Sequence, residues 1–304
     1  MVIRNLLLAC NRRTSVVKEQ IPLVSSLTPS YINVEQNGEV IYAVFSDPGL
    51  GQTPTLFVST DSGDTWQTRI NTFPGTDIQY VQGFDDGNTV WALLSRGLIE
   101  STDCGATWAP TSSSYINTTG NRRDFWGPSY MTASTDKQIV YAFGEETYFS
   151  GQTTNLYKSV NFGITFNVVM PDNIGWPGPD PSALWCSNDG QIAFLLTYDI
   201  WSVAYVTYRS FDGFSTRTVI PSPPTGTVRI KGSSDASVLV CNVRSGWQSV
   251  DTEFYVSTDF GTSWAKITSI GTVKTADAYD FDVTDDGKTL VVLGNTGITK
   301  YTNF

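Results

Sequence analysis

Histidine is absent from the 304-residue chain. Imidazole is the side chain that most often serves as a general base, as a metal ligand and as the base of a nucleophilic triad. Its absence excludes histidine-based triads and histidine metal centres. The sequence also contains no glycine-rich phosphate loop and no cluster of metal-ligating residues, so we expect neither a metal nor another cofactor.

Cysteine and positive charge are also scarce. Cys10, Cys104, Cys186 and Cys241 show no CxxC spacing, which favours free thiols in a reducing compartment. With 19 Lys and Arg against 29 Asp and Glu, the net charge of −10 argues against a nucleic-acid partner.

Long apolar runs are missing as well. None approaches the roughly 20 residues that span a bilayer, and the apolar stretch within residues 1–10 is too short for a secretion signal. We therefore expect no membrane span, and a location in the cytoplasm or in a particle such as a virion.

Aromatic and hydrophobic residues are plentiful, at 13% and 40%, and a repeat organises them. The pattern Ser-x-Asp-x-Gly-x-Thr-Trp, here called the corner, occurs at residues 59–66, 101–108 and 257–264, with weaker copies at 159–166 and 210–216. In this pattern the Asp accepts backbone hydrogen bonds, Gly supplies a positive φ, and Trp packs between sheets. We expect purely structural roles for Asp61, Gly63, Trp66, Asp103, Gly105, Trp108, Asn161, Gly163, Asp212, Asp259, Gly261 and Trp264.

A second signal precedes each corner by roughly 15–23 residues. Polar turns at residues 37–38, 86–87, 136–137, 189–190, 235–236 and 286–287 are each followed by an apolar run. Each unit then reads strand A, tight turn, strand B, loop, strand C, corner, strand D. Units of four strands and about 40–50 residues are typical of the blades of a β-propeller. We expect blades at about 29–72, 77–112, 128–171, 181–221, 226–269 and 275–304.

The sixth unit stops inside its corner, because residues 300–304 (KYTNF) echo only residues 158–162 (KSVNF). Residues 14–22 have the character of the missing strand D. The sequence therefore predicts an all-β protein with one domain over residues 1–304, a six-bladed propeller in which residues 1–22 supply the closing strand. Closing the ring removes a free sheet edge. Seven blades remain the alternative.

At its corners the chain resembles the Asp-box, or bacterial neuraminidase repeat, propellers, a superfamily that includes sialidases and sortilin-type receptors. The resemblance implies the fold and leaves the function open. Sialidases resemble one another in an Arg-Ile-Pro motif, where this chain has Gln20-Ile21-Pro22, and in three arginines, of which only Arg244 has a matching context. One arginine does not predict sialidase activity.

Function is expected on the propeller face that carries the D–A and B–C loops, here called the long-loop face, because binding usually resides in loops on a rigid scaffold. Aromatic and charged residues of these loops suit a glycan or a protein interface, although an aromatic can equally fill a gap between blades. The candidates are Tyr115, Arg122, Arg123, Asp124, Trp126, Glu145, Tyr148, Trp176, Asp199, Trp201, Arg244 and Trp247.

These residues favour a non-catalytic module that docks a protein partner or a glycan, for example within a viral or phage particle. A sialidase-like glycoside hydrolase is the open alternative. It requires two carboxyl groups about 5 to 10 Å apart, and Asp124, Glu145, Glu146, Asp180, Asp199 and Glu253 belong to the predicted face.

Overall fold

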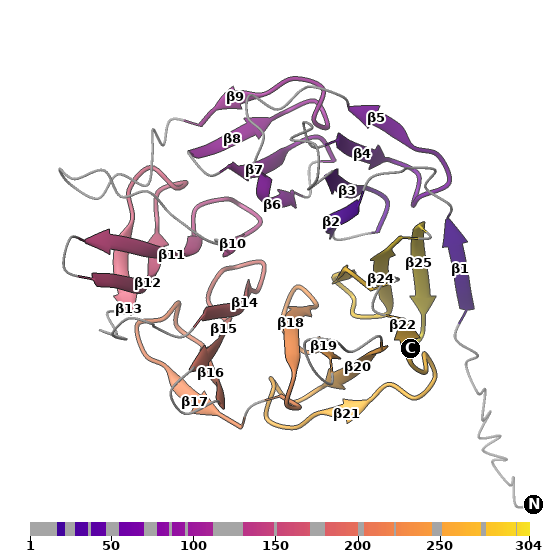
Figure 1. Ribbon diagram of the computed structural model, residues 1–304. Helices are drawn as coiled ribbons and strands as arrows, with labels where there is room; N and C mark the ends of the chain where they lie inside the picture. Colours follow the sequence, from indigo (N-terminus) through magenta and orange to yellow (C-terminus); the bar gives the residue numbers. More distant parts are fainter. Residues whose placement is uncertain are drawn as a thin grey trace, which may run out of the picture.

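The computed structural model describes residues 17–21, 28–35, 38–46, 55–69, 78–84, 87–94, 97–111, 130–148, 151–170, 180–199, 204–221, 223–244, 251–274, 278–295 and 297–304. Regular structure in these residues consists of β-strands alone. They form six antiparallel sheets around a central axis, which confirms the six-bladed propeller (Figure 1).

The first three blades follow one another along the chain, and each runs outward from its innermost strand. Blade 1 contains β2 (Thr28–Val34), β3 (Ile41–Ser46), β4 (Thr55–Ser59) and β5 (Gln67–Arg69). Blade 2 contains β6 (Ile78–Gly83), β7 (Val90–Leu94), β8 (Gly97–Ser101) and β9 (Ala109–Pro110). Blade 3 contains β10 (Tyr130–Ala133), β11 (Val140–Tyr148), β12 (Gly151–Ser159) and β13 (Asn167–Met170).

The remaining blades repeat this order. Blade 4 contains β14 (Asp180–Cys186), β15 (Ala193–Asp199), β16 (Ala204–Ser210) and β17 (Thr218–Ile220). Blade 5 contains β18 (Thr227–Gly232), β19 (Leu239–Arg244), β20 (Asp251–Ser257) and β21 (Ala265–Lys266), and the short β22 (Val273–Lys274) also pairs with β20. Blade 6 contains β23 (Asp280–Val283), β24 (Thr289–Gly294), β25 (Gly297–Thr302) and β1 (Val17–Ile21).

The two ends of the chain share blade 6. Strand β1 pairs antiparallel with β25, from Val17 opposite Thr302 to Ile21 opposite Ile298 (Figure 1). This pairing confirms the predicted ring closure. It satisfies the outer edge of β25, which would otherwise expose unpaired N–H and C=O groups.

The second strand of each blade contains an apolar run because neighbouring blades cover both of its faces. In β7, Val90, Trp91, Ala92 and Leu93 are all buried. Such a continuous run, rather than an alternating one, is the pattern of a strand that is buried on both sides. The core is therefore a ring of apolar layers between blades. Trp66, for example, packs in the layer that joins blade 1 to Val291 and Leu293 of blade 6.

Two segments expected to be loops are strands. Residues 144–148 continue β11, where Glu145 pairs with Thr154 and Tyr148 with Gly151. Tyr198 and Asp199 likewise extend β15. In blade 3 both strands of the hairpin are nine residues long, so their ladder hydrogen bonds continue beyond the apolar run that marks the core. Apolar periodicity alone does not reveal such an extension.

Candidate functional site

The corners use their carboxylates to hold the backbone. The Asp103 Oδ1 atom accepts the Thr107 N–H at 2.7 Å and the Ser101 hydroxyl at 2.8 Å, and Oδ2 accepts the Thr107 hydroxyl at 2.7 Å. These bonds, those from Thr107 above all, lower the pKa of Asp103 to about 2. The same arrangement recurs around Asp61, Asn161, Asp212 and Asp259. At these positions the side-chain oxygens hold the turn, in agreement with the structural role expected for them.

The corners lie against the A–B turns, and together they form what is called here the turn face. Ser62 donates its N–H to Glu39 O, and Cys104 donates to Asn88 O. Asn303 donates to Lys288 O and has a φ of 56°, as Phe162 has a φ of 60° and donates to Gln138 O. Asn303 in blade 6 therefore takes the place of Phe162 in blade 3. The similarity of residues 300–304 to residues 158–162 instead aligns Asn303 with Asn161.

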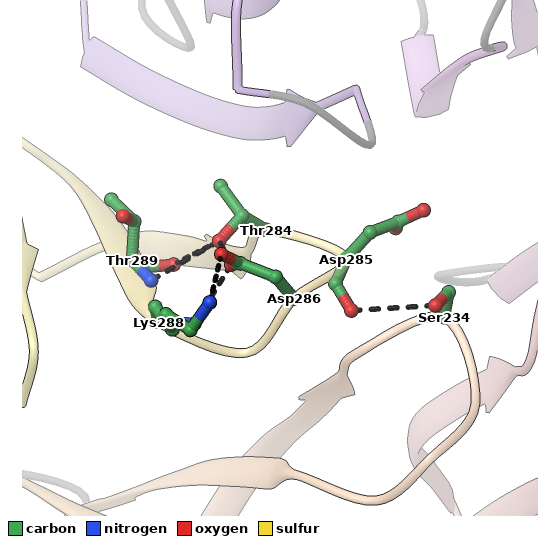
Figure 2. A network of polar contacts seen from close by, with 6 residues as sticks. All are labelled: Ser234, Thr284, Asp285, Asp286, Lys288 and Thr289. Atoms are coloured by element: carbon green, nitrogen blue, oxygen red, sulfur yellow. Dashed lines mark hydrogen bonds and ion pairs between the residues drawn. The ribbon is translucent and has the colours of Figure 1, made fainter.

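A second structural motif in the A–B turns is not evident from the turn dipeptides. Thr284 donates its hydroxyl to Asp286 at 2.8 Å and accepts the Thr289 N–H at 3.1 Å (Figure 2). Serine takes the same place at residues 134, 187 and 233, always two positions before the aspartate. This Ser/Thr-x-Asp spacing is the sequence signal that could have revealed it.

The A–B turns of successive blades are joined at the axis. Thr135 N donates to Asn188 O at 2.8 Å, Asn188 N to Ser234 O at 2.9 Å, and Ser234 N to Asp285 O at 3.1 Å. Asn188 Nδ2 adds a bond of 2.9 Å to Asp285 Oδ2. Figure 2 shows Asp285 beside Ser234, where the Ser234 hydroxyl also contacts Asp285 O at 3.3 Å. These bonds tie blades 3 to 6 together on the turn face.

Inside this ring lies a polar cavity lined by Asn33, Tyr80, Lys231 and Asp282, among others. Its volume of about 70 Å³ is enough for a few water molecules. It is too small for a sugar ring. The cavity belongs to the packing of the axis.

The lining of this cavity carries compensated charges. Lys231 is only 7% exposed, and its Nζ donates to the Tyr80 hydroxyl at 3.2 Å. Asp282 Oδ2 accepts Asn33 Nδ2 and Val34 N, both at 2.9 Å. Burial alone would lower the pKa of Lys231, but Tyr80, Asp282 and Asp280 together hold that pKa above its usual value. The amine stays charged at neutral pH.

At the long-loop end of the axis, a second charged group surrounds Asp280. Its Oδ1 lies 3.1 Å from Arg229 Nε, and its Oδ2 accepts the Ile32 N–H at 3.0 Å. Arg244, the last residue of β19, donates from Nη2 to Ala278 O at 3.4 Å. Burial, and then the charge of Arg229, lower the pKa of Arg244. Arg244 thus lies at the long-loop end, and its role in binding stays a prediction.

The other candidates are placed only by backbone position or not at all. Glu145, Tyr148 and Asp199 lie on β11 and β15, where Asp199 pairs with Ala204 and its neighbour Tyr198 pairs with Asp180. Glu253 is bound by Lys266 at 2.6 Å and by the Tyr255 hydroxyl at 3.0 Å. Outside the described residues lie Tyr115, Arg122, Arg123, Asp124, Trp126, Trp176, Trp201 and Trp247.

The described part of the chain has neither a metal-binding cluster nor a membrane-spanning helix. Within it, Cys, Asp and Glu side chains do not gather in groups of three or more that could hold a metal ion. No helix among the described residues has the length and apolar character needed to cross a membrane.

The chain is similar in sequence to a xyloglucanase. No family model matches the chain. A xyloglucanase from a Paenibacillus species is 24% identical over 246 residues, which cover 69% of this chain and 23% of the xyloglucanase. The chain thus spans less than a quarter of that protein's length.

Solved structures with the same fold cover nearly the whole chain. The GH74 xyloglucanase from Xanthomonas campestris has a TM-score of 0.56 and 16% identity, covering 88% of this chain and 44% of that one. YCF48 bound to D1 peptide has a TM-score of 0.54 and 14% identity, covering 94% of this chain and 97% of that one. At these identities the likeness establishes the propeller fold alone.

Proposed function

We propose that the chain is a carbohydrate-active propeller that binds a polysaccharide across its long-loop face and hydrolyses it in the manner of a glycoside hydrolase. The observation that carries this proposal is the 24% identity to a xyloglucanase, which extends over 69% of the chain. An alignment of 246 residues includes several blades.

Several described carboxylates are already bound within the structure. Lys266 binds Glu253 and Lys274 binds Asp251, each at 2.6 Å, and Asp280 lies against Arg229. These carboxylates already have basic partners, and the aspartates of the corners are bound by backbone N–H and hydroxyl groups. We propose that a catalytic pair comes from other acidic residues.

Blade 4 has two other acidic residues at its long-loop end. Asp180 begins β14 and Asp199 ends β15, at the long-loop end of blade 4, and Asp180 pairs with the residue next to Asp199. Asp180 pairs with Tyr198 and Asp199 pairs with Ala204, and consecutive residues of a strand lie on opposite faces of the sheet, so the register does not by itself place the two carboxyl groups together. Hydrolysis needs two carboxyl groups roughly 5 to 10 Å apart. We propose Asp180 and Asp199, from their position at the long-loop end of blade 4 alone, as candidates for the catalytic carboxylates.

The test measures binding and cleavage separately. Affinity electrophoresis in xyloglucan and other β-linked polysaccharides reports binding, and release of reducing ends reports hydrolysis. We expect Asp180→Asn and Asp199→Asn to lose at least 100-fold in hydrolysis while they keep binding, since general acid–base catalysis contributes about 10² to 10⁴ in rate. Glu253→Gln, which removes a carboxylate bound by Lys266, is the matched control and should retain activity.

Binding without cleavage by the wild-type protein would leave a glycan-binding module and remove the catalytic part of the proposal. A failure to bind any polysaccharide would overturn it entirely.

A peptide-binding module is the second candidate function. The observation that favours it is the two-way coverage with YCF48 bound to D1 peptide, 94% of this chain and 97% of that one, which matches a single propeller of the same extent. Peptides selected on the immobilised protein, in the absence of polysaccharide binding, would favour this function. A place in a viral or phage particle remains a prediction that no comparison tests.

A further inference from the structure

The large apolar side chains that the described residues expose gather in two adjacent blades. They lie in the corners and outer strands of blades 3 and 4, with exposed fractions between 40% and 67%. Called here the apolar rim, they are Val160, Phe162, Ile164, Val168, Phe211 and Val219. Lys158 Nζ donates to Gly213 O at 2.7 Å and so joins the two corners. The ring of Phe211 also contacts Phe260 in the corner of blade 5, with centroids 5.6 Å apart.

The corner of blade 1 shows that the fold does not require apolar side chains at these positions. Phe162 corresponds to Ser62 of blade 1, and both Val160 and Phe211 correspond to Thr60. Ser62 and Phe162 have the same backbone conformation, with φ of 59° and 60°. A cluster of exposed apolar groups that packing does not need is typical of an interaction surface. The apolar rim therefore points to a partner outside the chain.

The outer strands of the same two blades lack the residues that protect a free sheet edge. Strand β13 reads NVVM and β17 reads TVI, and the strand order of each sheet ends there (Figure 1). The outer strand of every other blade contains a charged residue or a proline, namely Arg69, Pro110, Lys266 and, in β1, Lys18. Such residues discourage pairing between molecules. Among the described strands, β13 and β17 are therefore the outer edges most open to another strand.

We propose that the apolar rim binds a second copy of this chain and that the two copies form a dimer about a two-fold axis. In such an interface the same surface faces itself, and an edge strand that pairs antiparallel with its own copy meets this requirement. The inference is independent of the proposed function.

The size of the apolar rim fits a dimer. Six side chains of this kind, each about half exposed, present on the order of 500 Å² of apolar surface. A standard interface buries about 800 Å² on each partner, and about 65% of a homodimer interface is apolar. The apolar part of such an interface is thus about as large as the rim.

The chemistry of the apolar rim disfavours other occupants. Valine and isoleucine offer a sugar neither hydrogen bonds nor an aromatic face. The net charge of −10 disfavours an anionic membrane surface. Charges of both signs, from Asp212 and the exposed Arg217, lie in the chain close to Phe211, so the surface can pair with itself.

Sedimentation velocity of the full chain between about 1 and 100 µM tests the proposal. The wild-type protein should populate a dimer as its concentration rises. The triple variant Val160→Thr, Phe162→Ser, Phe211→Thr carries the residues of the blade 1 corner, so it should fold normally, which circular dichroism checks. It should raise the dissociation constant of the dimer at least 100-fold, because it removes the centre of the interface.

Two further variants complete the experiment. Val219→Lys adds to β17 the kind of charge that Lys266 gives to β21, and it should weaken the dimer as well. Thr60→Ser combined with Ser62→Thr changes the matching corner of blade 1 and is the control, which should dimerise as the wild-type protein does. If the triple variant does not fold, Val219→Lys decides in its place.

Three outcomes would overturn the proposal. The first is a wild-type chain that stays monomeric at about 100 µM. The second is a dimer that the folded triple variant leaves intact, because the contact then lies elsewhere. The third is a monomeric wild-type protein that binds vesicles of neutral phosphatidylcholine while the triple variant does not, which would assign the apolar rim to lipid.

Discussion

At the scale of single residues, the corner aspartates show how one side chain stabilises a turn. Asp103 accepts the Thr107 N–H and hydroxyl and the Ser101 hydroxyl, while Ser101 in turn accepts the buried Gly105 N–H at 2.7 Å. In blade 3 an asparagine holds the same turn, because Asn161 Oδ1 accepts the Thr165 N–H at 2.9 Å. An amide can therefore replace the carboxylate.

This comparison predicts which of two substitutions at Asp103 lowers the free energy of unfolding more. Asp103→Ala removes all of these acceptors and should lower the free energy of unfolding by about 1 kcal/mol. Asp103→Asn should cost clearly less, since Asn161 supports the same turn. Chemical denaturation of both variants checks the order, and equal losses would contradict the role given to the side-chain oxygen.

Asp103 also predicts a pH dependence. Its pKa in the folded chain, about 2, lies below the ordinary value of 3.8 for an aspartate, so the ionised group stabilises the fold above about pH 4. That contribution is lost as the pH falls from 4 through 2. Thermal unfolding between pH 2 and 5 should show a weaker pH dependence for Asp103→Asn than for the wild-type protein. Parallel curves would show that Asp103 does not contribute.

At the scale of elements, the closing strand joins residues that are distant in the sequence. Strand β1 is the only partner of the outer edge of β25 among the described strands, and it brings Val17 opposite Thr302. Without it, β25 would present an unpaired edge, which invites pairing between molecules.

Deletion of residues 1–21 should therefore destabilise the propeller and promote aggregation. Deletion of residues 1–12, which leaves β1 in place, is the matched control and should not. Thermal unfolding and size-exclusion chromatography distinguish the two. A longer deletion that does not aggregate and has an unchanged melting temperature would show that β1 does not close the ring.

At the scale of the whole molecule, the axis is a polar core enclosed by an apolar ring. Lys231 of blade 5 reaches Tyr80 of blade 2, and Asp282 of blade 6 binds Asn33 and Val34 N of blade 1. A buried charge needs an opposite charge or hydrogen bonds to stabilise it. Removal of one partner therefore leaves the other charge unpaired in a poorly solvated site.

Asp282→Ala should accordingly lower the free energy of unfolding by about 3–5 kcal/mol, the loss typical of a broken buried charge network. Asp286→Ala removes an exposed aspartate from an A–B turn nearby and should cost much less. Denaturant titration measures both. Similar losses for the two variants would show that the axial network contributes no more to the free energy of unfolding than an exposed turn does.

The sequence determined the repeat, and with it most of the fold. The corners, the turn dipeptides and the apolar runs are local patterns, so they specify blades one at a time, and the incomplete corner at residues 300–304 together with residues 14–22 specified the closure. The extension of β11 through Tyr148 was missed because polar residues continue the ladder there.

Only the tertiary structure decided what lies on the axis. Lys231 and Tyr80 are 151 positions apart, and Asn33 and Asp282 are 249 apart, so no local pattern pairs them. The same holds for Arg229 and Asp280, which come from adjacent blades. A closed ring places the innermost strand of every blade beside one axis, and the contacts made there depend on the assembly of all six blades.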